Sequence, residues 1–112
     1  MSNKDYSVYV DHMLDCIDRI NEYATDESGF RDSILIQDAV LRNLQVLAES
    51  SQRLPDSLKE RYPEVPWRSI SGFRNILVHD YLGVDLDVVW SVVEMELPNL
   101  RAVLKKLQED LG

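Results

Sequence analysis

Apolar side chains recur every three or four residues along most of this 112-residue chain, which is the period of an amphipathic helix. In residues 4–24 the pattern predicts one long helix with its apolar positions at Tyr9, Met13, Cys16, Ile17, Ile20 and Ala24. The run from Thr25 to Gly29 predicts a break, because glycine and short polar side chains favour turns. A second long helix is expected over residues 32–54, with a wide apolar face at Ile34, Ile36, Val40, Leu41, Leu44, Leu47, Ala48, Ser51 and Leu54.

Prolines divide the middle of the chain. Pro55 ends the second helix and can begin a short one over residues 56–61, since its missing N–H would have no partner in a first helical turn. Pro63 and Pro66 bias the residues before them away from helix, so the chain around them is expected to be extended. A third helix should start at Pro66 and end near Gly83, with an apolar face at Trp67, Ile70, Phe73, Ile76 and Leu77.

The last part of the chain predicts one more long helix. Asp85 is a candidate cap, and the apolar positions that follow are Val88, Val89, Val92, Val93, Leu97, Leu100, Leu104 and Leu107. Pro98 removes the backbone bond to Glu94 and should kink this helix without ending it. No strand alternation appears, so we expect an all-α bundle with four main helices plus short helices, in one domain of residues 1–112.

Composition supports a folded protein in a reducing compartment. Hydrophobic residues make up 45% of the chain, and glycine and proline are few, which is typical of a globular domain. The single cysteine cannot form an intrachain disulfide, and the N-terminus lacks a basic and then apolar layout, so we expect a cytoplasmic protein. The longest apolar run is too short to cross a membrane.

The charge distribution qualifies what the protein can bind. The net charge is −8, which argues against a broad basic surface for nucleic acid. Only residues 51–81 are not acidic overall, because their basic residues (Arg53, Lys59, Arg61, Arg68 and Arg74) outnumber Asp56, Glu60, Glu64 and Asp80. Such a small difference between segments is also common in proteins without a binding function.

The segment from Gly72 to Gly83 carries the candidate chemistry. It places Arg74, Asn75, His79 and Tyr81 among Phe, Ile, Leu and Val, although arginine is almost never fully buried unless it is paired. Two interpretations follow from the residues alone. The polar groups either satisfy one another, with Arg74 in an ion pair that anchors helices, or they converge on a ligand.

Helical geometry sharpens the ligand interpretation. Arg74 and His79 are five residues apart, so on a regular helix they point roughly 140° apart and do not share a face. Asn75 and His79 do share one, as do Arg74 and Tyr81. For Arg74 and His79 to meet on one phosphate, the helix must unwind near His79, or the second group must come from another chain.

The motif from Arg74 to Tyr81 resembles the Arg-x4-His-x-Tyr signature of the HepT-like toxins, which form part of the HEPN superfamily. The resemblance extends to flanking stretches, at Pro63-Glu64-Val65-Pro66-Trp67-Arg68, Gly83-Val84-Asp85, Val89-Trp90 and Asp38-Ala39-Val40-Leu41-Arg42. It implies an HEPN-type helical bundle that acts as a homodimeric, metal-independent endoribonuclease, with both motifs lining one cleft. It also implies a toxin–antitoxin pair with a minimal nucleotidyltransferase, the MNT antitoxin.

The family assigns roles to the motif. Arg74 and His79 are its expected catalytic residues, and Asn75 and Asp80 are expected to support them. Tyr81 corresponds to the tyrosine to which the antitoxin attaches AMP. Glu49 lies where the family has a Gly-Glu-Ala-like element, here Ala48-Glu49-Ser50, and is a candidate to pair with an arginine of the motif. RNA is the implied substrate, and no cofactor is expected.

Several residues have plainer interpretations. His12 beside the first apolar stripe is expected at the solvated rim, and Cys16 is expected to be a buried apolar residue rather than a nucleophile. Trp67 and Trp90 are better explained as core or interface residues than as platforms for base stacking. The alternative function is a non-catalytic HEPN module that binds a nucleotide or a partner protein, which the acidic net charge favours.

Overall fold

The computed structural model describes the backbone of residues 3–112 and the side chains of residues 6–80 and 82–112. Within that range every regular element is helical, and no strand is present. The elements are α1 (Asn3–Tyr23), α2 (Glu27–Asp32), α3 (Ile34–Gln52), α4 (Asp56–Lys59), α5 (Trp67–His79), the 3₁₀ turn η1 (Tyr81–Gly83), α6 (Leu86–Ser91), the π turn η2 (Val92–Glu96) and α7 (Leu97–Leu111). The predicted all-α fold class is confirmed.

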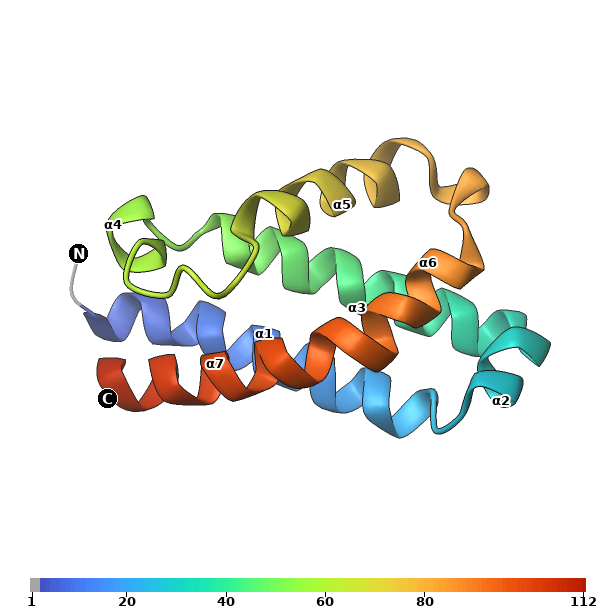
Figure 1. The fold of residues 1–112 in the computed structure, drawn as a ribbon, viewed down its shortest axis with the longest axis horizontal. Helices are drawn as coiled ribbons and strands as arrows, with labels where there is room; N and C mark the ends of the chain where they lie inside the picture. The colour runs from blue at the N-terminus through green and yellow to red at the C-terminus, as the bar shows by residue number, and fades with distance from the viewer. Residues whose placement is uncertain (1–2) are drawn as a thin grey trace.

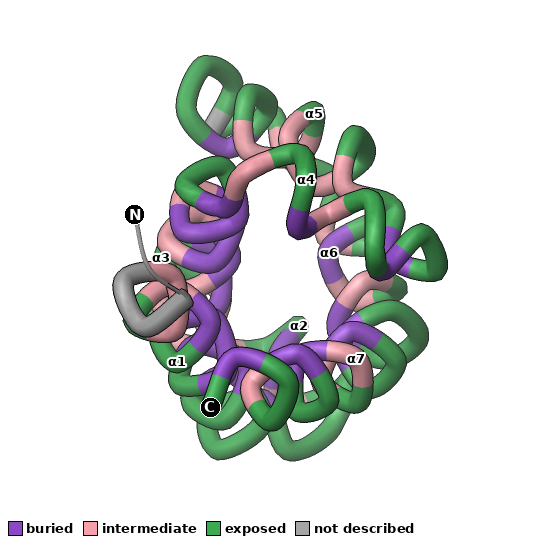
Figure 2. Tube along the Cα trace, turned by 90° about the vertical axis from the view of Figure 1, so that its left-hand side faces the viewer, coloured by how far each residue is buried: buried purple, intermediate pink, exposed green. Residues whose placement is uncertain are grey.

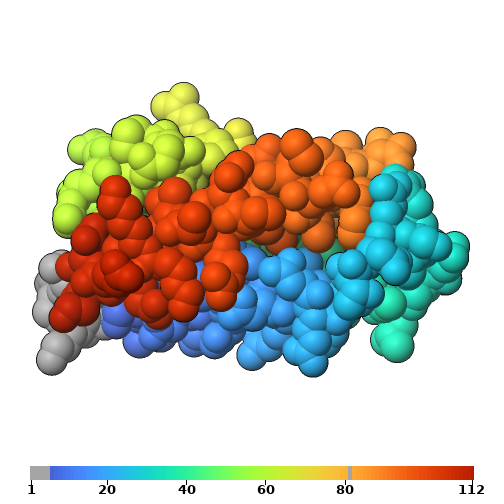
Figure 3. All heavy atoms as spheres, turned by 60° about the horizontal axis from the view of Figure 1, so that its bottom comes forward, coloured from blue at the N-terminus to red at the C-terminus, as the bar shows by residue number. Residues whose placement is uncertain are grey.

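The four long helices run alternately in opposite directions along the long axis of the molecule (Figure 1). The first of them, α1, packs against both α3 and α7, and α3 also packs against α5. Figure 3 shows the side chains of α1 and α7 meeting along one face. Two side-chain bonds join these helices, from Arg101 Nε to Asp18 Oδ1 (3.0 Å) and from Gln108 Nε2 to Asp11 Oδ1 (2.7 Å). The first and last long helices, α1 and α7, are therefore held side by side by packing and by polar bonds.

Buried side chains form one cluster where α1, α3 and α7 meet, as the inward-facing buried residues in Figure 2 indicate. Its largest fully buried members are Phe30, Met13, Ile17, Ile20, Leu77, Leu104 and Leu107. The apolar stripes predicted for the first and last helices supply 11 of the 24 buried residues of this cluster in the described range. Burial of such side chains is worth roughly 1.5–3 kcal/mol each, so the bundle is stabilised chiefly along α1, α3 and α7.

The junction after α1 differs from the sequence prediction. The expected break over residues 25–29 contains the start of α2, because the Asp26 carboxylate accepts the backbone N–H of Gly29 (2.6 Å) and caps a new helix. Ser33 then caps α3 through the N–H of Ile36 (3.2 Å), so that helix starts at Ile34 and not at residue 32. Ile34 is 74% exposed and does not belong to the buried face predicted for it.

Polar contacts hold the connector between α4 and α5. The Tyr62 hydroxyl donates to the Asp110 carboxylate of α7, and burial together with this carboxylate raises the pKa of Tyr62. The Trp67 indole N–H donates to the backbone oxygens of Lys59 (3.2 Å) and Tyr62 (3.1 Å). These bonds position the first residue of α5 relative to the C-terminal helix.

The distortion expected at Pro98 takes the form of a π turn. Leu97 N–H bonds to Val92 O, five residues back, and the helical chain then continues into α7 with Pro98 in its first turn. Widening the turn accommodates the proline, which lacks an N–H and cannot bond four residues back. The apolar period consequently continues on both sides of Pro98, as predicted.

The exposed fractions of Leu77 and Leu35 predict how much each side chain contributes to the free energy of unfolding. Leu77 of α5 is 1% exposed against α3, whereas Leu35 of α3 is 80% exposed. We expect Leu77→Ala to lower the free energy of unfolding by about 2–5 kcal/mol, because it removes buried methyl groups and leaves a cavity. The same change at Leu35 should lower it by less than about 0.5 kcal/mol. Urea denaturation followed by circular dichroism measures both, and equal losses would contradict the packing of α5 on α3.

Candidate functional site

Helix α5, which the sequence predicts to end near Gly83, ends four residues earlier, at His79. The N–H of Asp80 still bonds to Ile76 O (2.8 Å), but the backbone of Asp80 leaves the helical region at φ −137° and ψ 46°. A 3₁₀ turn follows, in which a Cβ at position 83 would lie 2.5 Å from Asp80 Oδ1. Gly83 therefore permits the Asp80 carboxylate to fold over the turn, and this tight arrangement stops the helix before Gly83.

The motif residues lie on different sides of α5. Leu77 is buried against the bundle, Arg74 is half-buried, and Asn75 and His79 are exposed. Since α5 is regular through His79, the helix does not unwind to bring His79 beside Arg74. No hydrogen bond joins these two side chains in the described part of the chain. Within one subunit, Arg74 and His79 thus remain on separate faces, as helical geometry predicted.

The Arg74 guanidinium has little to neutralise it. Its Nη1 donates to Asn75 Oδ1 (3.3 Å), while its Nε is buried without a partner among the described residues. No described carboxylate lies within salt-bridge distance of it, and Asp80 is turned toward Gly83. The ion pair considered as a structural role for Arg74 is absent among the described side chains, so the arginine retains donors and a charge that can bind an anion. The Asn75 side chain thus accepts a hydrogen bond from Arg74, and among the described residues no hydrogen bond joins it to His79.

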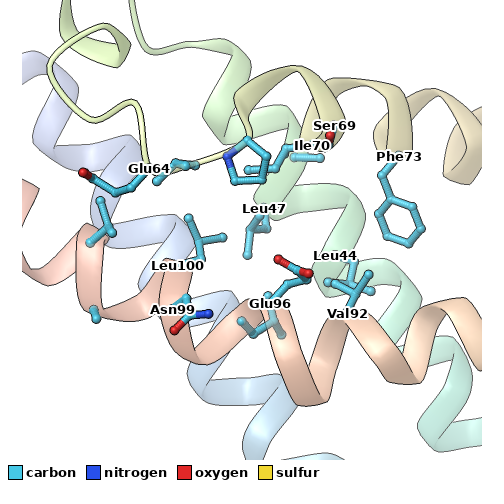
Figure 4. Close-up of a pocket in the computed structure, with 16 residues that line it drawn as sticks. Leu44, Leu47, Glu64, Ser69, Ile70, Phe73, Val92, Glu96, Asn99 and Leu100 are labelled. Carbon is cyan, nitrogen blue, oxygen red and sulfur yellow. The ribbon is translucent and has the colours of Figure 1, made fainter.

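The pairing expected between Glu49 and a motif arginine is not formed. Glu49 Oε1 instead accepts from Gln45 Nε2 on its own helix (3.1 Å). Because α3 and α5 run antiparallel, Ile70 and Leu47 line one part of their contact, and Phe73 and Leu44 line the next (Figure 4). This register places Glu49 level with the first turn of α5, about six residues before Arg74.

One exposed stripe of α5 was not recognised from the sequence. Arg68, Gly72, Asn75 and His79 are all exposed, and their spacing of four, three and four residues places them on one side of the helix. The same spacing in the sequence was the signal that could have identified Arg68 and Gly72. In addition, α5 contains no Asp or Glu, although every other α-helix of the described chain contains at least one. The site therefore lies on a basic helix of an acidic protein.

A groove opens on the other side of α5, between this helix and α7, with α3 at its base (Figure 4). Its volume is about 920 Å³, and its lining is mostly apolar. Among the described residues, Glu64 and Glu96 are the only charged ones that line it, and none of Arg74, Asn75 or His79 does. This groove is therefore separate from the motif.

The remaining candidates have structural surroundings. His12 is exposed, as expected. The Trp90 ring packs on Phe30 (5.5 Å between centroids), and its N–H donates to Glu94 Oε2 (3.3 Å). Cys16 is buried, and this burial raises the pKa of its thiol, which disfavours the nucleophilic thiolate.

Three further observations concern metal binding, membrane spans and Tyr81. Among the described side chains, no group of three His, Cys, Asp or Glu residues is placed to hold a metal ion. No helix in the described range is both long and apolar enough to cross a lipid bilayer. The side chain of Tyr81, the expected site of AMP attachment, lies outside the described residues.

Comparison with known proteins gives consistent matches. The family model described as "Ribonuclease HepT-like" matches residues 13–107. A Thermococcus cleftensis protein named "Probable ribonuclease HepT" is 35% identical, over 96% of this chain and 97% of its own length. The "mRNA nuclease HepT" of Shewanella oneidensis is 27% identical, over 85% of this chain and 90% of its own.

A longer relative also matches. A Methanocaldococcus jannaschii protein named "Gamma-glutamylcyclotransferase and putative RNase" is 37% identical over 96% of this chain, which spans 50% of the relative's length. No solved structure matched the chain.

Proposed function

The chain belongs to the HepT-like ribonuclease family, and on this premise we propose that it is an endoribonuclease toxin whose chemistry depends on Arg74 and His79. The observation that carries the proposal is the state of Arg74. Its guanidinium is held on α5 with a buried Nε that has no partner among the described residues, and no described carboxylate lies within salt-bridge distance. A guanidinium in this state is suited to bind a phosphate through charge-assisted hydrogen bonds.

The reaction we infer is attack by the ribose 2′-hydroxyl on the adjacent phosphorus. A base accepts the hydroxyl proton, the new O–P bond forms, and the P–O5′ bond breaks as an acid donates a proton to O5′. The products are a 2′,3′-cyclic phosphate and a 5′-hydroxyl. Histidine is the side chain suited to either proton transfer near neutral pH. Arg74 would stabilise the negative charge that develops on the phosphate oxygens.

A homodimer supplies what one chain lacks. One motif holds one histidine, but two motifs around a two-fold axis hold both an acid and a base. The neighbourhood of His79 favours such a contact, because Ile76 (49% exposed), Val78 (38%) and Leu82 (98%) place apolar side chains on the surface around it. A partner that covers them would also bring its own Arg74 toward His79, which the intact helix α5 prevents within one chain.

Control by a nucleotidyltransferase antitoxin follows from the family resemblance. Tyr81 begins the 3₁₀ turn directly after α5, two residues from His79. Attack of its phenolic oxygen on the α-phosphate of ATP would release pyrophosphate and attach AMP. The bulk and negative charge of that group would then occupy the place of an RNA phosphate beside His79.

The alternative is a non-catalytic module that binds a nucleotide or a partner protein. The net charge of −8 favours it, because the protein as a whole repels RNA. Nucleotide binding that depends on Arg74, in a purified protein without cleavage activity, would support this alternative.

We expect His79→Ala to reduce the rate of RNA cleavage by about 10²–10⁴-fold, because it removes the proton-transfer group. Arg74→Ala should reduce it by about 10²–10³-fold through lost charge stabilisation. His12→Ala is the matched control, since His12 is exposed on α1, and it should cleave as the wild type does. Gel analysis of a labelled RNA measures all three, and undiminished cleavage by His79→Ala would refute the mechanism.

Dimerisation generates a separate expectation. Leu82→Glu places a charge on the most exposed leucine beside the motif and should convert the dimer into monomers, with loss of cleavage. Val8→Glu, at an exposed apolar position near the start of α1 and at the opposite end of the bundle from Leu82 (Figure 1), should leave the mass and cleavage unchanged. Light scattering after gel filtration measures the mass, and an active monomer would contradict the shared cleft.

Tyr81 should gain AMP when the protein is produced together with its nucleotidyltransferase and ATP. Peptide mass spectrometry locates the modification, and Tyr81→Phe should both prevent it and abolish neutralisation. Tyr23→Phe serves as the control, because Tyr23 is exposed on α1. Effective neutralisation of a protein with unmodified Tyr81 would indicate inhibition by binding alone.

A further inference from the structure

We infer that the outward stripe of α5, formed by Arg68, Gly72, Asn75 and His79, is a track for the backbone of single-stranded RNA. Arg68 in this track binds a phosphate that flanks the scissile one. The inference rests on the proposed ribonuclease function and extends it to substrate binding beyond the cleaved bond.

The first observation is the charge of α5. Its 13 residues include Arg68 and Arg74 and no carboxylate, whereas the whole chain has 20 Asp and Glu against 12 Lys and Arg. A polyanion is repelled by most of this surface and is attracted to the one helix that carries only positive charge. Arg68 is exposed and makes no ion pair with the described residues.

The second observation is Gly72, in the interior of α5. A Cβ built at this position would meet no atom within 4 Å, and no described residue of the chain has a positive φ. Nothing within the subunit therefore requires glycine here, although glycine destabilises a helix interior by about 1 kcal/mol relative to alanine. A glycine on an exposed face is explained if an external group approaches the backbone closely.

The third observation is the placement of Arg68 relative to the motif. Arg68 shares its side of α5 with His79 but is turned about 120° from Arg74 and lies about 9 Å before it along the axis. The two arginines therefore point to different positions on a bound strand. Gly72 lies between Arg68 and His79 on the same stripe, so a strand that reaches His79 from Arg68 crosses the open backbone at Gly72.

The stripe itself favours RNA over a second copy of the chain. Its side chains are polar or absent, and contact between two copies would bring like-charged arginines together without a described carboxylate on α5 to pair with them. The exposed apolar side chains beside it, Ile76, Val78 and Leu82, are the better candidates for subunit contact.

The test compares KM and kcat for two substrates, a 12-nucleotide single-stranded RNA and a dinucleotide, which has no flanking phosphate. Arg68→Gln should raise KM for the 12-mer by roughly tenfold with little change in kcat, since it removes one charge-assisted contact. The KM for the dinucleotide should change much less. The salt dependence of 12-mer binding should also become shallower, by about 0.7 in log–log slope. Arg53→Gln, an exposed arginine outside α5, is the control.

Gly72→Ala provides an independent test, because it should stabilise the protein while it weakens RNA binding. The methyl group should raise the melting temperature by roughly 4 °C and raise KM for the 12-mer, because it obstructs the strand. Unchanged KM and salt slope in both variants would overturn the inference. A shift of Gly72→Ala from dimer to monomer in light scattering would also overturn it and assign the stripe to the subunit interface.

The outcomes separate this inference from the proposed function. If the wild-type protein cleaves RNA and the Arg68 and Gly72 variants behave as the wild type, only the track is wrong. If the wild-type protein cleaves nothing, anisotropy of a labelled 12-mer still reports whether binding depends on Arg68. Binding that depends on Arg68 without cleavage would retain the track and reject the ribonuclease.

Discussion

The site depends on the packing of α5 against α3. Ile70, Phe73 and Leu77 attach one side of α5 to the bundle, and the helical rotation of 100° per residue then determines where every other side chain of α5 can point. Leu77 fully buried means that His79, two residues on, is turned outward. Arg74 lies between these directions, at the edge of the contact, where its stem is covered and its charge remains available.

This constraint explains why the two proposed catalytic residues, Arg74 and His79, stay apart within one subunit. A regular helix that satisfies its backbone bonds through His79 cannot also turn His79 toward Arg74. Ending the helix at Asp80, with the Asp80 carboxylate over Gly83, preserves that separation. In the proposed mechanism a second chain completes the site, and the exposed apolar side chains next to the motif offer a surface for such a contact.

The net negative charge of the chain limits where it could bind RNA. An acidic protein gains little from a polyanion by long-range attraction, so the RNA binding that we propose would be local and would involve the helix without carboxylates. One side of α5 packs against α3, and another lines a mostly apolar groove. The exposed stripe is therefore the surface of α5 that remains for such binding. The groove between α5 and α7 has a different character, with glutamates and apolar side chains and no basic group in its lining.

The sequence by itself determined the helical class, the approximate position of the four long helices and the conflict between Arg74 and His79. These follow from local periodicity and proline chemistry, which act over a few residues. Its errors lie at junctions, where Asp26 and Ser33 form caps that the apolar period does not reveal, and in the exposure of Ile34.

The tertiary structure alone decided which apolar residues are covered, that Glu49 bonds to Gln45 of its own helix and not to Arg74, and that Arg74 has no carboxylate partner in the described chain. The physical reason is that these properties depend on the register between helices distant in sequence. That register is set by the packing of α5 on α3, and no pattern within either helix specifies it.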